Sequence, residues 1–315
     1  MKQKEPLELN LTITNNSASQ QVCSLFGANF TLLLPKSVIS NIFVGPGPRR
    51  MAFNPLTNTM YAVNPVANSV SIINCTNNTA GIQILTPISP RFIAYNSASN
   101  KMYVSCFTSQ DINVIDCSTN TVVTTIPIGE DVQGIAYDIT DNRMYVCASD
   151  TNNITVIDCS NDTILTTIPT AGTFAFGITY NQKMNRMYVS NFTYGDVSVI
   201  DCTTNTVISL IPISALSSPN SLAYNMLNNT IYVTLSGIGI VSIIDPDTNT
   251  VIANITVGTS PRGIAYDRAN NNMYVNNFTD GNAMIINCAS NTILSTITLG
   301  ASPDGIAFNP TNNNV

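Results

Sequence analysis

Arginine is the residue type in this sequence best placed to do chemistry, because it recurs at one position of a repeated pattern. Arg49, Arg91 and Arg262 each stand three residues before the alanine of an apolar-Ala-aromatic element. The equivalent positions of the other copies, together with the neighbouring Arg50, complete a set of eight: Arg49, Arg50, Arg91, Gln133, Phe176, Asn220, Arg262 and Asp304. A guanidinium presents a planar fork of donors that suits carboxylate, sulfate or phosphate. The set is therefore a candidate anion-binding site.

Two interpretations of this set remain open. As a basic notch on an acidic chain, it would bind a carboxylated glycan or an acidic tail of a partner. Alternatively, the arginines brace Asp304 and nearby backbone carbonyls and have only a structural role.

Composition excludes several other functions. The 315 residues contain no histidine and no tryptophan, which removes any imidazole base, any Ser-His or Cys-His pair and any histidine-ligated metal. A net charge of −6 argues against nucleic acid as a partner. No apolar run is long enough to span a membrane. The residues argue against most hydrolases, and we expect no metal and no cofactor.

Acidic, amide and thiol side chains recur once per repeat. Asp116, Asp158, Asp201 and Asp245, with Asn74 and Asn287, precede turns, where their oxygens would cap backbone amides rather than hold calcium. Five of the eight cysteines follow these positions, in different repeats and without CxxC spacing, so we expect small buried thiols rather than disulfides or zinc ligands.

The element that carries the arginines recurs seven times, with alanine or its counterpart at 52, 94, 136, 179, 223, 265 and 307. Each copy is followed by further β-branched or aromatic runs bounded by Asn, Asp, Gly or Pro, the signature of four strands per repeat. Four antiparallel strands every 40 to 45 residues predict a β-propeller. The eight residues would then meet at the mouth of its central channel, and we call them the mouth ring.

The seventh copy stops after its first strand, at 304–309, and the N-terminal part carries matching pieces. Residues 21–24 resemble a second strand, 31–35 a third, and 38–45 match the fourth strand at 251–258. We therefore expect a closed seven-bladed propeller over 20–315, whose last blade combines three N-terminal strands with one C-terminal strand. Residues 1–19 lie outside it as an arm, whose alternation over 7–14 predicts a strand that lies on a blade edge or mediates self-assembly.

Tyr-Val-Ser-Asn at 188–191, its variants, and the Ser-Pro-Arg-Gly and Ser-Pro-Asp-Gly segments at 260–263 and 302–305 resemble the YVTN-type β-propeller repeat. The resemblance covers 20–315. It implies a seven-bladed fold and a likeness to archaeal surface-layer propellers and other cell-surface or secreted modules. Propeller lactonases and lyases also share the shape, but their sites generally need histidine or clustered carboxylates with a metal.

Three Asn-Phe-Thr sequons begin at Asn29, Asn191 and Asn277, in loops that join second to third strands. They predict glycans on one face, or they reflect duplication of the repeat. The start of the chain lacks an apolar signal core, which would fit a cytoplasmic protein or a processed one. We expect a non-enzymatic extracellular or cell-surface scaffold that binds a protein or glycan through its loop face. The alternatives are a propeller enzyme at the channel, a surface-lattice or filament subunit, and a cytoplasmic interaction platform.

Overall fold

The computed structural model describes residues 21–25, 28–32, 37–170 and 172–315. The chain divides into two units, 1–37 and 38–315, and each is described by itself. In the first, β1 (Gln21–Leu25) pairs with β2 (Ala28–Leu32) as an antiparallel hairpin. The predicted arm at 1–19 lies outside the described residues.

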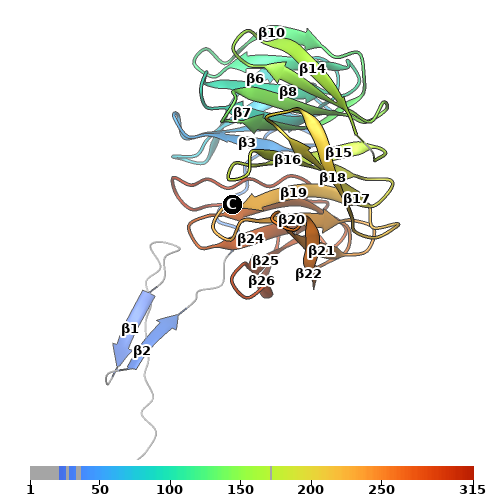
Figure 1. Cartoon of the computed structure of the whole chain (residues 1–315). Helices are drawn as coiled ribbons and strands as arrows, with labels where there is room; N and C mark the ends of the chain where they lie inside the picture. The colour runs from blue at the N-terminus through green and yellow to red at the C-terminus, as the bar shows by residue number, and fades with distance from the viewer. Residues whose placement is uncertain (1–20, 26–27, 33–36, 171) are drawn as a thin grey trace, which may run out of the picture. The chain divides into compact units, whose positions relative to one another are not determined.

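The second unit contains six antiparallel sheets of four strands each, which follow one another along the chain from blue to red in Figure 1. Blade 1 consists of β3 (Met51–Asn54), β4 (Thr59–Asn64), β5 (Ser69–Asn74) and β6 (Thr79–Leu85). Blade 2 consists of β7 (Pro90–Asn96), β8 (Lys101–Cys106), β9 (Asp111–Asp116) and β10 (Thr121–Pro127). Blade 3 consists of β11 (Val132–Asp138), β12 (Arg143–Ala148), β13 (Asn153–Asp158) and β14 (Thr163–Pro169). Blade 4 consists of β15 (Ala175–Asn181), β16 (Arg186–Asn191), β17 (Asp196–Asp201) and β18 (Thr206–Pro212). Blade 5 consists of β19 (Pro219–Asn225), β20 (Thr230–Leu235), β21 (Ile240–Asp245) and β22 (Thr250–Thr256). Blade 6 consists of β23 (Pro261–Asp267), β24 (Asn272–Asn277), β25 (Asn282–Asn287) and β26 (Thr292–Thr298).

Asparagine sets the turns between these strands. Asn100, Asn120, Asn205 and Asn249, among others, have φ between 50° and 60°, a left-handed conformation that asparagine tolerates better than most residues. The predicted capping role of the recurrent acidic position is also confirmed, since Oδ1 of Asp116 accepts the Ser118 amide at 2.7 Å. The abundance of asparagine therefore follows from the many tight turns of the fold.

The core lies between neighbouring blades and is clamped by tyrosines of the second strands. Tyr145 is fully buried, and its hydroxyl donates to Oδ1 of Asn205 in the next blade at 2.7 Å. Tyr61 and Tyr232 make the same bond to Asn120 and Asn291, at 2.6 and 3.0 Å. Each such tyrosine fastens its blade to the last turn of the following one.

The prediction of seven blades is wrong: the described residues form six. Residues 21–25 and 28–32 pair with each other across a two-residue connection, which needs only local loop closure, rather than with the C-terminal segment. Residues 38–45 form no strand, although the Val44 carbonyl accepts a bond from the Ser71 hydroxyl of blade 1. Sequence likeness to a fourth strand therefore did not suffice, because a strand also needs a neighbour that pairs with its backbone.

The last copy of the first strand lies, without a sheet of its own, between blades 6 and 1. The Gly305 carbonyl accepts a bond from Nδ2 of Asn276 in β24, at 2.9 Å. On its other side, a Cβ at Gly305 would lie 1.6 Å from the Arg49 carbonyl oxygen. Asn309 then donates to Asn58 of blade 1 at 3.2 Å. Residues 304–309 thus bridge the two ends of the propeller.

Candidate anion-binding site at the channel mouth

The mouth-ring residues lie at or just before the start of each first strand. Arg91, Gln133, Phe176, Asn220 and Arg262 are each the second residue of β7, β11, β15, β19 and β23. Close backbone packing brings neighbouring members together, because a Cβ at Gly177 or Gly263 would lie 2.1 or 2.4 Å from the carbonyl oxygen of Asn220 or Asp304. Glycine at these positions lets adjacent first segments approach.

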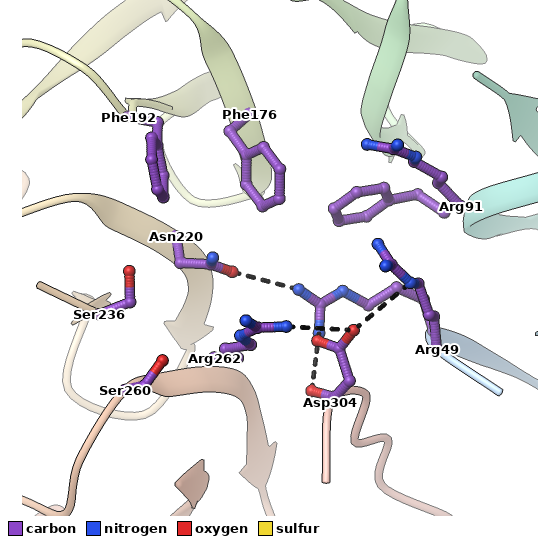
Figure 2. A pocket seen from close by; sticks show the side chains of 11 residues that line it. Arg49, Arg91, Phe176, Phe192, Asn220, Ser236, Ser260, Arg262 and Asp304 are labelled. Atoms are coloured by element: carbon purple, nitrogen blue, oxygen red, sulfur yellow. Dashed lines mark hydrogen bonds and ion pairs between the residues drawn. The ribbon is translucent and has the colours of Figure 1, made fainter. Parts of the chain in front are cut away.

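Seven of the eight mouth-ring residues line one cavity of about 420 Å³ (Figure 2). The full lining consists of Arg49, Arg50, Arg91, Phe92, Phe176, Phe192, Asn220, Ser236, Ser260, Arg262 and Asp304. Gln133 lies outside the lining and is buried, but its Oε1 accepts a bond from Arg91 at 3.2 Å. The structure therefore gathers the predicted set, while binding itself stays a prediction.

Asp304 is the only carboxylate among the described residues that line the cavity, and three arginines surround it. Its carboxylate lies 3.1 Å from Nη1 of Arg50, 3.8 Å from Nε of Arg49 and 3.9 Å from Nη1 of Arg262. The bracing role considered from sequence is thus present. The cavity lining contains four arginines and one aspartate, so its net charge is +3.

Arg50 reaches across the channel mouth, and its side chain is only 13% exposed. Its Nη1 donates to the Asp304 carbonyl oxygen at 2.7 Å, and its Nη2 donates to Oδ1 of Asn220 in blade 5 at 3.1 Å. Burial lowers the pKa of the Arg50 guanidinium; Asp304 opposes this shift, whereas the charges of Arg49 and Arg262 add to it. Arg50 stands where the third, fourth, sixth and seventh copies have glycine, and it is the only charged residue at this position in the seven copies.

Two arginines are held flat against phenylalanine rings from the loops between second and third strands. The guanidinium carbon of Arg91 lies 3.5 Å from the ring centre of Phe107, and that of Arg262 lies 3.5 Å from the ring centre of Phe278. Stacking fixes the plane of each guanidinium and leaves its edge free to donate. Arg91 has no ion pair with any described residue, and burial lowers its pKa.

A phenylalanine wall faces these charges, and sequence reasoning missed it. Phe92, Phe176 and Phe192 line the cavity, and Figure 2 shows Phe176 and Phe192 across from Arg262 and Asp304. One signal was present for Phe192, which directly follows the end of a second strand, as Phe107 and Phe278 do in other copies. The segments of Phe192 and Phe278 are also the Asn-Phe-Thr sequons that predict glycans.

The asparagines of those sequons are placed unfavourably for glycosylation. Asn191 is fully buried, and its Nδ2 donates to Asp196 at 2.6 Å and to Ser198 at 2.8 Å. Asn277 is also fully buried and donates to Asn282 at 2.8 Å. A glycan on either Nδ2 would displace these bonds. The side chain of Asn29 lies outside the described part of the chain.

The recurrent cysteine and acidic side chains form no further candidate site among the described residues. Seven cysteines have described side chains, and all seven are free thiols; six of them are buried, as predicted, and Cys75 is half-buried. In the described ranges, no group of three or more Cys, Asp or Glu side chains is arranged to hold a metal ion. No helix among the described residues is long and apolar enough to cross a bilayer.

These observations define the class of fold: an all-β propeller of four-stranded antiparallel blades. No protein-family profile matches the sequence, and comparison with curated proteins gives no match. Among solved structures, the chain is similar to Kuenenia stuttgartiensis hydrazine synthase, with a TM-score of 0.79 and 17% identity over 89% of this chain and 94% of that chain. At this identity the likeness supports the fold alone.

Proposed function

We propose that this propeller is a non-enzymatic binding module that holds an anionic group of its partner at the channel mouth. One observation carries the proposal: four arginines and a single aspartate line one cavity in a chain whose net charge is −6. Positive charge concentrated in a concave site on an acidic molecule attracts anions from solution and holds them in a partly desolvated place.

The side chains of the cavity support binding rather than turnover. Its one carboxylate, Asp304, is already engaged in ion pairs with three arginines and is not free to contact a substrate proton. The chain supplies no imidazole. A lactonase-like or lyase-like propeller would need a base or metal ligands in the channel, and the lining residues other than Asp304 are Arg, Phe, Asn and Ser. The hydrazine synthase shares the fold with this chain at 17% identity, which supports no activity for this chain.

An extracellular or cell-surface location belongs to the same proposal, with protein or glycan as partner. Its support is a charged fraction of only 10%, with polarity supplied largely by Asn, Thr and Ser. The surface-layer resemblance and the lattice or filament alternative depend on the repeat motifs and on residues 1–19, and they remain hypotheses. Fractionation of the native source, with an antibody against the propeller, distinguishes a surface from a cytoplasmic location.

Calorimetric titration with two anionic probes, oligogalacturonate and a hexaglutamate peptide, tests the binding proposal. We expect at least one probe to bind more weakly as salt increases. The variant Arg91→Gln should lose about tenfold in affinity, the value of one charge-assisted hydrogen bond. Arg268→Gln is the matched control, because it removes the same charge beyond the other end of β23. Equal affinity in both variants would contradict the proposal.

A further inference from the structure

We infer that the group held at this mouth is a carboxylated sugar ring, with its carboxylate toward the arginines and its C–H face against the phenylalanine wall. The inference rests on the proposed anion site and deepens it. The cavity has a cationic side, an aromatic side and a polar uncharged side. A uronic-acid residue has a carboxylate, a C–H face and hydroxyl groups that can interact with these three sides.

The first side is cationic and leaves one arginine available. Arg49 and Arg262 lie 3.8 and 3.9 Å from Asp304, at the long end for ion pairs, whereas Arg91 has no such pair among the described residues. Stacking on Phe107 orients the Arg91 guanidinium, and among the described residues only its Nη1 is engaged, by the hydrogen bond to Gln133. A carboxylate on the ligand would complete this side by a paired donor–acceptor contact.

The second side is the aromatic wall. The rings of Phe92 and Phe176 meet edge to face at 5.6 Å, and those of Phe176 and Phe192 lie 5.7 Å apart. These contacts fix the rings and leave half-buried apolar surface toward the cavity. The electron-rich face of such a ring attracts the C–H groups on the flat side of a pyranose.

Phe174 supports this wall from a strained backbone conformation. It stacks on Phe176 at 6.2 Å with an interplanar angle of 17°, and its backbone has φ of 60°. The equivalent loop position is serine with positive φ in four other copies, as at Ser89, Ser218 and Ser260, and it is glycine or aspartate in the remaining two. A bulky side chain in this left-handed conformation is strained, and such strain is characteristic of functional sites.

The third side is polar and uncharged. Ser236, Ser260 and Asn220 line it, and in Figure 2 the two serines lie together beside Arg262. The Ser260 hydroxyl and the Asn220 amide nitrogen have no hydrogen-bond partner among the described residues, so both are available to a ligand. Sugar hydroxyls act as donor and acceptor and match these groups.

Other anions can interact with fewer of these three sides of the cavity. A glutamate side chain brings a carboxylate but no flat apolar face for the phenylalanines. An aromatic acid brings both, but it leaves Ser260 and Asn220 without partners. The cavity volume of about 420 Å³ lies in the range of roughly 300–1,000 Å³ of small-ligand sites. Arg50, which crosses the mouth, limits the depth to which a longer chain could thread.

The test compares four probes by calorimetric titration of the whole protein: digalacturonic acid, its dimethyl ester, hexaglutamate and benzoate. We expect digalacturonic acid to bind most tightly and the uncharged ester to bind at least tenfold more weakly. The variant Phe192→Leu should weaken digalacturonic acid between about two- and tenfold, the range for one aromatic contact, without changing the affinity for hexaglutamate. Tyr194→Leu is the matched control, because it removes an exposed aromatic ring from the same loop outside the cavity. Thermal melting of each variant verifies that it is folded.

The possible failures are distinguishable. If hexaglutamate or benzoate binds as tightly as digalacturonic acid, or Phe192→Leu has no effect, the sugar assignment is overturned while the anion site stands. If no anionic probe binds, or Arg91→Gln leaves every affinity unchanged, both the sugar assignment and the proposed function fail.

Discussion

The side-chain Nδ2 of Asn309 donates a hydrogen bond to Oδ1 of Asn58 at 3.2 Å, although 251 residues separate the two along the chain. The same bond links other successive copies, from Asn54 to Asn100 at 2.9 Å and from Asn225 to Asn271 at 3.1 Å. The C-terminal segment therefore makes the contacts of a first strand, and Asp304 reaches the arginines of both blade 1 and blade 6 because of it.

Gly305→Ala tests this junction. The added Cβ would lie 1.6 Å from the Arg49 carbonyl oxygen, so the segment must move away from blade 1. We expect a loss of about 2–4 kcal/mol in unfolding free energy, measured by chemical denaturation. Gly81→Ala is the control, since its nearest atom is 3.4 Å away and it should change stability by about 0.5 kcal/mol or less. Similar stability of the two variants would contradict this account.

Asp304→Asn should have opposite effects on stability and on anion binding. Removing the carboxylate leaves Arg50, largely buried, without its counter-charge, and we expect unfolding free energy to fall by about 3 kcal/mol. The affinity for sulfate should rise, because Arg49 and Arg262 are freed to bind it. Denaturation and calorimetric titration measure the two effects. A parallel fall in stability and affinity would show that Asp304 only holds the cavity together.

Stability should decline at alkaline pH because of the buried thiols. Burial raises the pKa of Cys117 and Cys288 to about 11 and that of Cys159 and Cys202 to about 12. An unfolded thiol titrates near about 8.5. The contribution is therefore complete below pH about 8.5 and is lost as pH rises from there through the folded values. Denaturation midpoints between pH 7 and 10 measure it. The slope should be smaller in Cys159→Ala, and no slope in the parent protein would refute the linkage.

Asn191 and Asn277 should carry no glycan in protein from its native source. Their amide nitrogens are buried and donate to neighbouring side chains, so modification would cost these bonds. Peptide mass spectrometry decides it, with the exposed sequon at Asn161 as an internal comparison. Glycan mass at Asn191 would mean that this end of blade 4 opens before modification.

Much of this fold could be predicted from the repeat. The recurrent Asn turns and the alternation of β-rich runs predict four strands per copy, and equivalent loop positions predict which residues meet at the mouth. The repeat could not predict whether a seventh blade forms, because residues 21–25 pair with the adjacent residues 28–32. The phenylalanine wall was also missed, because residues such as Phe92 and Phe192 come from different strands and loops that only the folded ring brings together.

The tyrosine clamps have a consequence for how such a protein changes over generations. Each hydroxyl, such as that of Tyr61 or Tyr145, bonds to an equivalent position in whichever copy comes next. If recombination deletes or duplicates one internal copy, the tyrosine of the copy before it meets an Asn or Asp at the equivalent position of its new neighbour. This hydrogen bond between blades is therefore preserved when copies are exchanged, while the individual loops are free to diverge toward different ligands.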